Sequence, residues 1–315
     1  MAWLSDYTYK KKVTLTGQTG AGTDYQVKLL IGKTSGATGE DFDLNEHCLD
    51  TFADIRFTDN DETTELKYWI ESVAVSGTSY LATVWVKVAD SLESGTPDIY
   101  IYYGKAEDTT TSSGADTFIK YHGSTTADFR DTVATLGTQL RFGSKSRVTA
   151  DSHHIIWGIS NFDVGGSGQD ALYVGSQSGG TDTRGIASKK NGSTTRVAEA
   201  PNFVTNTWYR LEWLYDTTSL HGYVDGNEIS TGVTTGLTSA DMGLNMWEIV
   251  GSGEQEWSFV AKYVSPEPSY SSAGGEETSI SGPANLKSYN GLAIASIKSI
   301  MGLGIADIKS VNGLE

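Results

Sequence analysis

The sequence predicts an all-β protein: two antiparallel, jelly-roll-like β-sandwich domains followed by a short repetitive C-terminal tail. Three observations support this fold class. Gly (36), Tyr (16) and Trp (8) are abundant beside many Ser and Thr residues, which is typical of short strands joined by polar turns. Apolar residues alternate with polar ones in many short runs, and no long amphipathic helical pattern occurs. A chain of 315 residues is also long enough for about two domains, each with its own core.

The first sandwich is predicted over residues 1–104. The runs "YKKKVTLTG" and "DYQVKLLIG" are its first strands, and "ADIRFTDNDETTELKYWIES" is a hairpin with an acidic reversal. In "SYLATVWVKVAD", Ala82, Val84, Val86 and Val88 share one face of a strand, while the intervening residues share the other. "PDIYIYYGK" supplies the last strand.

The second sandwich is predicted over residues 118–270, between two linkers. Residues 105–117 are rich in Ser, Thr and Asp, and residues 271–285 are rich in Gly and Ser, so neither is expected to form a regular element. The clearest hairpins turn at Asn191-Gly192 and Asp225-Gly226, because these pairs accept the positive φ of a type I′ turn.

Residues 286–315 form a tail with an eleven-residue repeat, whose units begin at Leu286, Ile297 and Ile308. This period also fits a right-handed coiled coil, but each glycine in a helix costs about 1 kcal/mol relative to alanine. We therefore favour turn-plus-strand units over a continuous helix, with a short helical turn over 306–312 that Gly313 caps. The residues expected to mediate assembly are Leu286, Tyr289, Leu292, Ile294, Ile297, Ile300, Leu303, Ile305, Ile308, Val311 and Leu314.

Charge and cysteine content exclude several classes of partner. Lys and Arg number 23 against 39 Asp and Glu, a formal charge of -16, so neither nucleic acid nor a membrane surface is an expected partner. Cys48 is the only cysteine, which excludes an intramolecular disulfide and a cysteine-based zinc cluster. The first residues contain no apolar h-region, so we expect no secretory signal. Either a signal upstream of this sequence has been removed, or the protein leaves its cell by another route, as virion proteins do when they assemble in the cytoplasm and are released by lysis.

Several of these motifs resemble known families. "DIRFTDNDETTELKYWIE", "ATVWVKV" and "IYIYYGK" resemble the domain-of-unknown-function 2341 family over roughly residues 6–104. That family occurs at the front of bacterial, archaeal and phage surface or structural proteins, and it implies no catalytic residues. "WYRLEWLYDTTSLHGYVDGNEI" and "AKYVSPEPSY" make residues 118–270 resemble a concanavalin-A/laminin-G-like jelly roll, and "NGLAIASIKS" resembles tails of phage structural proteins.

Jelly rolls of this kind include glycosidases, which need two acidic residues close together. Glu212 and Asp216 lie four residues apart, so their separation along a strand is about 13 Å. This exceeds the limit of about 9.5 Å for an inverting pair. Glu248 is followed two residues later by Val250 rather than by an acid, and no Gly-x-Ser-x-Gly motif occurs. No catalytic residue is predicted.

Weaker signals suggest ligand sites. Asp59 and Asp61, and likewise Asp163 and Asp170, offer calcium oxygens at loop tips, although Asp also makes turns for structural reasons. No cofactor is expected, with calcium at these positions as the alternative. The aromatic residues that could stack on a sugar, or else belong to the core, are Trp157, Tyr173 and Trp247.

Together these features predict a non-enzymatic virion structural protein on a phage tail, fibre or capsid surface. Its lectin-like domains would face outward, and its tail would attach it to other copies of itself and to other virion proteins. The basic tail residues Lys287, Lys298 and Lys309 favour an acidic neighbour, such as a second copy of the chain. The alternative is a carbohydrate-binding module of an extracellular or cell-surface prokaryotic protein that binds surface glycans; a glycosidase is the least favoured hypothesis.

Overall fold

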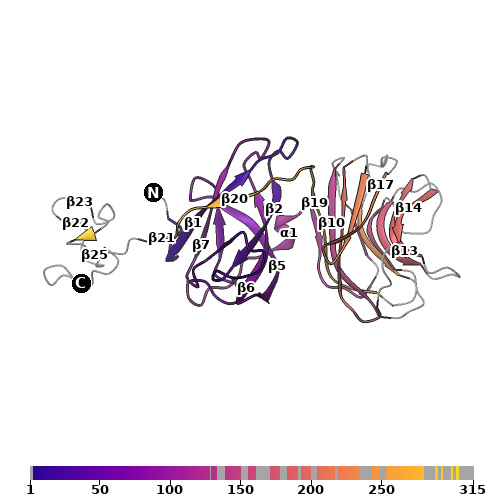
Figure 1. Ribbon diagram of the computed structural model, residues 1–315, viewed down its shortest axis with the longest axis horizontal. Coiled ribbons are helices and arrows are strands. Elements are labelled where there is room, and N and C mark those ends of the chain that lie inside the picture. The colour runs from indigo at the N-terminus through magenta and orange to yellow at the C-terminus, as the bar shows by residue number, and fades with distance from the viewer. Residues whose placement is uncertain are drawn as a thin grey trace.

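The computed structural model confirms the predicted fold class: two β-sandwiches joined side by side (Figure 1). Among the described residues, no helix has the length and apolarity needed to cross a membrane. The structure describes residues 3–127, 129–132, 139–149, 155–160, 171–177, 183–190, 193–199, 204–216, 219–233, 243–248, 253–279, 288–289, 292–293, 299–300 and 303–304.

The first sandwich consists of nine strands in the order β20-β1-β7-β4-β5-β6-β2-β3, with β21 also paired to β1. Strand β5 joins the two layers, because it pairs with β4 through Glu65–Leu66 and with β6 from Lys67 onward. The strands are β1 (Tyr9–Thr16), β2 (Tyr25–Gly32), β3 (Phe42–Asp43), β4 (Arg56–Thr58), β5 (Glu65–Ser76), β6 (Ser79–Val88), β7 (Asp98–Tyr103), β20 (Ser269–Ala273) and β21 (Glu277–Thr278).

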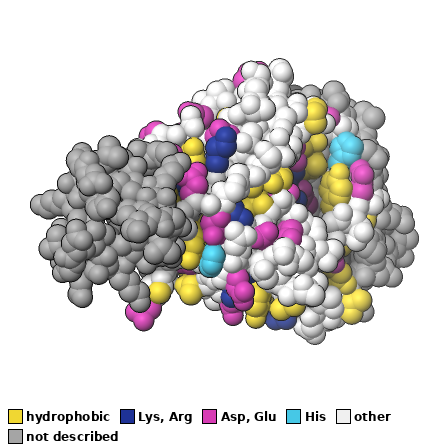
Figure 2. Space-filling model, turned by 60° about the vertical axis from the view of Figure 1, so that its left-hand side comes forward, with side chains coloured by type: hydrophobic (Ala, Val, Ile, Leu, Met, Phe, Trp, Pro, Cys, Tyr) yellow, Lys and Arg dark blue, Asp and Glu magenta, His cyan; other side chains and the backbone are white. Residues whose placement is uncertain are grey.

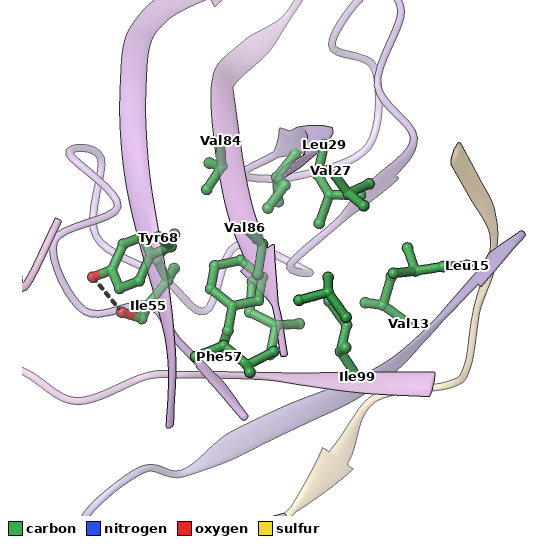
Figure 3. Close-up of a cluster of buried hydrophobic side chains, with 14 of the residues drawn as sticks. Val13, Leu15, Val27, Leu29, Ile55, Phe57, Tyr68, Val84, Val86 and Ile99 are labelled. Atoms are coloured by element: carbon green, nitrogen blue, oxygen red, sulfur yellow. Dashed lines mark hydrogen bonds between the residues drawn. The ribbon is translucent and has the colours of Figure 1, made fainter. Parts of the chain in front are cut away.

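The core of this sandwich lies between the two layers. Figure 3 shows Val13 and Ile99 from one layer facing Val27 and Val86 from the other, all at most 1% exposed. Tyr68 closes one end and donates a 2.9 Å hydrogen bond to the Ile55 carbonyl. The side chains that the alternation in β6 predicted to share a face are therefore buried together.

The segment after the second sandwich returns to the first one. Strands β20 and β21 both pair antiparallel with β1, and the Ser279 amide donates a 2.7 Å hydrogen bond to the Thr8 carbonyl. The carboxylate of Glu276 holds this segment in place by accepting hydrogen bonds from Tyr103 Oη (2.7 Å) and contacting His47 Nδ1 (3.0 Å). The prediction that residues 271–285 are a linker is therefore wrong for 271–273 and 277–278, because β1 supplies the backbone partners that this polar segment needs.

The second sandwich consists of two six-stranded antiparallel sheets. The sheet next to the first sandwich has the order β17-β16-β15-β10-β19-β8, and the outer sheet has the order β14-β13-β12-β11-β18-β9. The first contains β8 (Lys120–His122), β10 (Leu140–Val148), β15 (Tyr209–Tyr215), β16 (Ser219–Val224), β17 (Asn227–Val233) and β19 (Gly253–Lys262). The second contains β9 (Phe129–Thr132), β11 (Ile155–Ser160), β12 (Ala171–Gln177), β13 (Thr183–Lys190), β14 (Ser193–Glu199) and β18 (Gly243–Glu248).

The predicted turn at Asp225-Gly226 is present between β16 and β17. Both residues have positive φ, 50° and 78°, as a type I′ turn requires. The turn predicted at Asn191-Gly192 lies outside the described residues, although the flanking residues Lys190 and Ser193 pair with each other.

The predicted linker 105–117 is attached to the first sandwich over its last residues. The Ile70 amide donates to Ser112 Oγ at 2.8 Å, and the Ser113 amide donates to the Tyr68 carbonyl at 2.9 Å. Ser113 then caps helix α1 (Gly114–Thr117), where its side chain accepts from the Asp116 amide. This connection is ordered by β5 and leads directly into the second sandwich.

The described part of the tail consists of two small hairpins. Strands β22 (Ser288–Tyr289) and β23 (Leu292–Ala293) pair with each other, as do β24 (Ser299–Ile300) and β25 (Leu303–Gly304). The second hairpin repeats the first after eleven residues, as turn-plus-strand units predict. Four of the predicted assembly residues, Tyr289, Leu292, Ile300 and Leu303, lie in these strands. The other seven and the predicted helical turn over 306–312 lie outside the described residues.

Candidate functional site: the outer sheet of the second sandwich

The second sandwich has one side turned to the first sandwich and one turned away from it. In Figure 1, β10 and β19 lie beside the first sandwich, whereas β13 and β14 lie at the far end of the molecule. We call the side of the β10–β19 sheet that faces the first sandwich the interface face. The side of the β11–β12 sheet that faces away from the core is the outer sheet face.

Aromatic side chains fill the interface face. Trp69 of β5 contacts Trp257 of β19 edge to face, with ring centroids 5.2 Å apart. Phe118, just after α1, stacks on Phe259 at 4.0 Å. Gly143 on β10 makes room for this ring, because a Cβ there would lie 2.4 Å from Phe259 Cζ. The two sandwiches therefore share a buried aromatic cluster rather than a loose contact.

Matched charges surround this cluster. Arg210 of β15 pairs with Glu71 of the first sandwich at 2.5 Å and also with Glu212. Arg141 of β10 pairs with Glu212 at 3.2 Å and with Glu267. Burial alone would raise the pKa of Glu212, but Arg141, Arg210 and Lys28 lower it by more, and this pKa falls to about 2.

The surroundings of Glu212 and Asp216 disagree with a catalytic role for these two acids. A general acid of a glycosidase needs a raised pKa, whereas the pKa of Glu212 is lowered and its side chain is enclosed between two arginines. The carboxylate of Asp216 instead accepts hydrogen bonds from the amide and hydroxyl of Ser219, at 2.7 and 2.8 Å. Both acids are thus occupied by structural partners.

The outer sheet face is identified from β18. Leu244 and Met246 are at most 1% exposed and belong to the core of the second sandwich. Because successive residues of a strand point to opposite faces, Asn245 and Trp247 are on the outer sheet face. Residues directly opposite each other on paired strands share a face, so the register of the ladder extends this assignment across the sheet.

One row of residues crosses all six strands of this face. It runs from β9 at one edge to β14 at the other, and its members are paired in register as Arg130, Asn245, Gly158, Tyr173, Ala187 and Arg196. The adjacent rows on the same face contain many small residues, namely Gly243, Ala171, Gly175 and Gly185. The row through Gly243 and Ala171 also holds Thr132, Ser160, Lys189 and Thr194, and the row through Gly175 and Gly185 also holds Trp247, Ile156 and Glu199.

The register separates the three predicted sugar-stacking residues. Trp157 is opposite Met246, which places it on the core side of the sheet. Tyr173 and Trp247 are on the outer sheet face. The sequence reasoning did not identify Arg130, Asn245 or Arg196, although the alternation in "LNMWE" and "STTRVAE" contains the signal once the core side is known.

Turn chemistry accounts for the first predicted calcium cluster. Asp61 accepts hydrogen bonds from the Thr64 hydroxyl (2.6 Å) and from the Thr63 and Thr64 amides (2.8 Å each), and these hold its pKa below the usual range. Asp59 accepts from the Asn60 amide at 2.7 Å. Within the described ranges, no group of three or more His, Cys, Asp or Glu side chains could hold a metal ion. The other two candidates, Asp163 and Asp170, lie outside those ranges.

Comparison with solved structures gives low-scoring likenesses to lectin-like proteins. Sheep galectin-11 in complex with glycerol has a TM-score of 0.30 and 14% identity, covering 47% of this chain and 96% of that one. Carbohydrate-binding module CBM66 from Bacillus subtilis has a TM-score of 0.29 and 10% identity, covering 50% and 94%. The CBM40 of a Ruminococcus gnavus sialidase, bound to α2,3-sialyllactose, has a TM-score of 0.34 and 10% identity, covering 47% and 94%. The ligands of these proteins are theirs and do not carry over to this chain.

A comparison with curated proteins gave no match. One family model, described as Domain of unknown function (DUF2341), matches residues 51–134. The match starts later than the motifs suggested and extends past residue 104, through α1 and β8 to β9 of the second sandwich. It confirms that this part of the chain, with the motifs in β5, β6 and β7, resembles that family.

Proposed function

We propose that this protein is a non-enzymatic binding and display protein. In this proposal the outer sheet face binds glycans, and the C-terminal tail attaches the molecule to a larger assembly. The observation that carries the proposal is the outer sheet face itself, where Tyr173, Trp247, Asn245 and two arginines share one side of a sheet and no described strand lies beyond it in Figure 1.

The chemistry of these residue types suits a sugar. Aromatic rings such as Trp247 stack on the apolar C–H face of a pyranose, while an amide such as Asn245 both donates to and accepts from hydroxyl groups. Binding sites commonly combine an apolar floor with a few polar groups that fix orientation.

A glycan array probed with the full-length chain tests this proposal. We expect binding that is lost in Trp247→Ala and Tyr173→Ala but kept in Tyr80→Ala, a matched aromatic control that is 36% exposed on β6 of the first sandwich. Absence of binding to every glycan, with folded protein and with or without calcium, would contradict glycan recognition. Unchanged binding in Trp247→Ala would place the ligand elsewhere.

The same glycans test the non-enzymatic part. We expect them to be recovered intact after long incubation, because Glu212 is held as a carboxylate by Arg141 and Arg210 and cannot act as a general acid near neutral pH. Product that disappears in Glu212→Gln or Glu248→Gln would instead establish a hydrolase.

Attachment through the tail is supported by where the chain leaves the body. Ser279 is hydrogen-bonded beside Thr8, on the side of the first sandwich opposite to the interface with β10 and β19 (Figure 1). A tail that starts there leaves the outer sheet face free. A two-stranded hairpin alone is at best marginally stable in water, so the repeated hairpins of the tail need a protein partner, either another copy or a neighbouring protein.

We propose a virion surface as this assembly, with a prokaryotic cell surface as the alternative; both are sites where glycans are met outside the cell. Light scattering on the full-length chain and on a chain ending at Pro283 tests the attachment role. We expect self-association only with the tail present. If both chains are monomeric, self-association is contradicted. Localisation of the tail in purified particles distinguishes a virion surface from a cell surface.

A further inference from the structure

Lys10 of β1 is a lysine with no exposed surface. Its side chain is 0% exposed, although lysine is almost never fully buried unless it is paired. Lys12, two residues further along the same face of β1, has a side chain that is 42% exposed. Figure 2 shows acidic side chains scattered over the first sandwich with few basic ones among them. Lys10 is enclosed together with two of these acids.

Two carboxylates from separate segments meet the ammonium group of Lys10. Its Nζ is in direct contact with Oε2 of Glu62, in the loop between β4 and β5, and lies 3.5 Å from Oε2 of Glu277. Glu277 is directly opposite Lys10 in the pairing of β21 with β1. Glu62 is positioned by the turn of its loop, where its amide donates a 3.0 Å hydrogen bond to the Asp59 carbonyl. The backbone therefore fixes all three side chains around one point.

Aromatic side chains shield this contact from water. The ring centroids of Trp3 and Tyr100 lie 4.7 and 5.0 Å from Nζ of Lys10. The hydroxyl of Tyr102 donates a 3.4 Å hydrogen bond to Oε2 of Glu62, whose side chain is 13% exposed. An ion pair held away from water loses the hydration of both charges. The pair is thus in an environment that favours an uncharged product.

We propose that Lys10 and Glu62 join in an intramolecular amide bond, so that this site is a site of covalent modification by the protein itself. Condensation of the two side chains removes both buried charges and releases one water molecule. The fold holds the amine and the carboxyl group in contact, which supplies much of the lowering of the activation barrier that such a reaction needs. This proposal does not depend on glycan binding or on the role of the tail.

The reaction needs no group from outside the chain. A proton passes from Nζ of Lys10 to Oε2 of Glu62, which gives a neutral amine and a neutral carboxylic acid. The lone pair of Nζ forms a bond to Cδ of Glu62, and the C=O π electrons move onto Oε1. The carboxylate of Glu277 accepts a proton from Nζ and returns it to Oε2. The bond from Cδ to Oε2 then breaks, water leaves with that electron pair, and the C=O double bond re-forms.

The new bond lies where it reinforces the edge of the first sandwich. It joins β1 to the loop between β4 and β5, at the residue of β1 that pairs with β21. The same strand holds β20 and β21, which precede the tail in the chain. Force that reaches β1 through these strands is then resisted by a covalent bond as well as by hydrogen bonds.

Intact-protein mass spectrometry of the full-length chain, incubated folded near neutral pH, tests the proposal. We expect a mass one water below that of the sequence, and a peptide map in which the peptides containing residues 10 and 62 are joined. Lys10→Arg keeps the positive charge without the amine and should have the full mass of its sequence, as should Glu62→Ala. The matched control is Lys12→Arg, at an exposed lysine that lies 3.2 Å from Asp98 on the same face; it should still lose one water.

Glu277→Gln tests the proton transfer. It removes the carboxylate that faces Nζ and should slow the loss of water at least about tenfold. An unchanged rate overturns the role of Glu277 and leaves the amide bond in place. A parent chain that keeps the full mass of its sequence overturns the proposal, because Lys10 and Glu62 are then a permanent ion pair. Loss of water in Lys10→Arg also overturns it, because the water then comes from another part of the chain.

Discussion

The two faces of the second sandwich carry similar residue types with different surroundings. The interface face combines Trp257, Arg141 and Arg210 with Glu212, and the first sandwich covers it. On the outer sheet face the register places Trp247, Arg130 and Arg196, with Glu199 at the edge strand β14. The first face is satisfied within the chain, since buried charges need partners. In the proposed function, the partner of the second face is a glycan from outside the chain.

This difference predicts which substitutions should change the stability of the protein and which should change glycan binding. Changes on the interface face should destabilise the protein and leave any glycan binding intact in the folded fraction. Substitutions on the outer sheet face should weaken glycan binding and leave the stability of the protein unchanged.

Trp69→Ala should have the largest effect. It removes a buried ring that contacts Phe118, Trp257 and Phe259, and such a truncation costs about 3–5 kcal/mol. Denaturant unfolding monitored by tryptophan fluorescence measures the loss, and Val75→Ala, at a position 70% exposed, should stay within about 0.5 kcal/mol. A small loss for Trp69→Ala would mean that the two sandwiches barely stabilise each other.

The carboxylate of Glu212 should make stability depend on pH. Its pKa is lowered from 4.5 to about 2 in the folded state, so its contribution is fully present above pH about 4.5 and is lost as the pH falls to about 2. The loss should reach about 3 kcal/mol. Glu212→Gln should be less stable at neutral pH and should show a flatter acid profile; an acid profile identical to the parent would contradict the ion-pair assignment.

Arg210 and Glu71 should be coupled across the interface. In a double-mutant cycle with Arg210→Met and Glu71→Gln, we expect an interaction free energy of about 1–3 kcal/mol from unfolding measurements. The pair Lys12 and Asp98, whose side chains are 42% and 25% exposed, serves as the control and should give less than about 1 kcal/mol. Equal values for the two pairs would remove the distinction between buried and surface charges.

Trp247→Ala should have the smallest effect on stability. Because the register places residue 247 on the side away from the core, the expected change is within about 0.5 kcal/mol. A loss as large as that of Trp69→Ala would show that the indole ring is packed inside the protein, and the contrast between the two faces would then fail.

Alternation in the sequence predicted the core but not the interface. It assigned Val84 and Val86 of β6 to one face and Trp85 to the other, and the valines are indeed buried in the first sandwich. Trp85 is 1% exposed as well, because the second sandwich covers the outer side of β6. The alternation of side chains along a strand cannot distinguish a face exposed to solvent from a face that packs on a second domain.

The candidate site could not be identified from the sequence, because it depends on pairing between strands that are distant in the chain. Arg130, Asn245 and Arg196 come from three separate parts of the chain, and only the register of six strands brings them into one row. Strand β20, with the polar sequence "SYSSA", was also beyond sequence reasoning. Its local preference for a strand is weak. Its pairing partner, β1, lies more than two hundred residues earlier in the chain.

The return of residues 269–278 to β1 makes the second sandwich an insertion within the first. During synthesis the inserted module has all its strands once Lys262 has emerged, whereas the module that began first must wait for β20 and β21. Until then β1 presents an unpaired edge, the type of edge at which chains aggregate or exchange strands. The first sandwich is thus the first to begin on the ribosome and the last to be completed. The edge of β1 has to be protected during most of the synthesis of the chain.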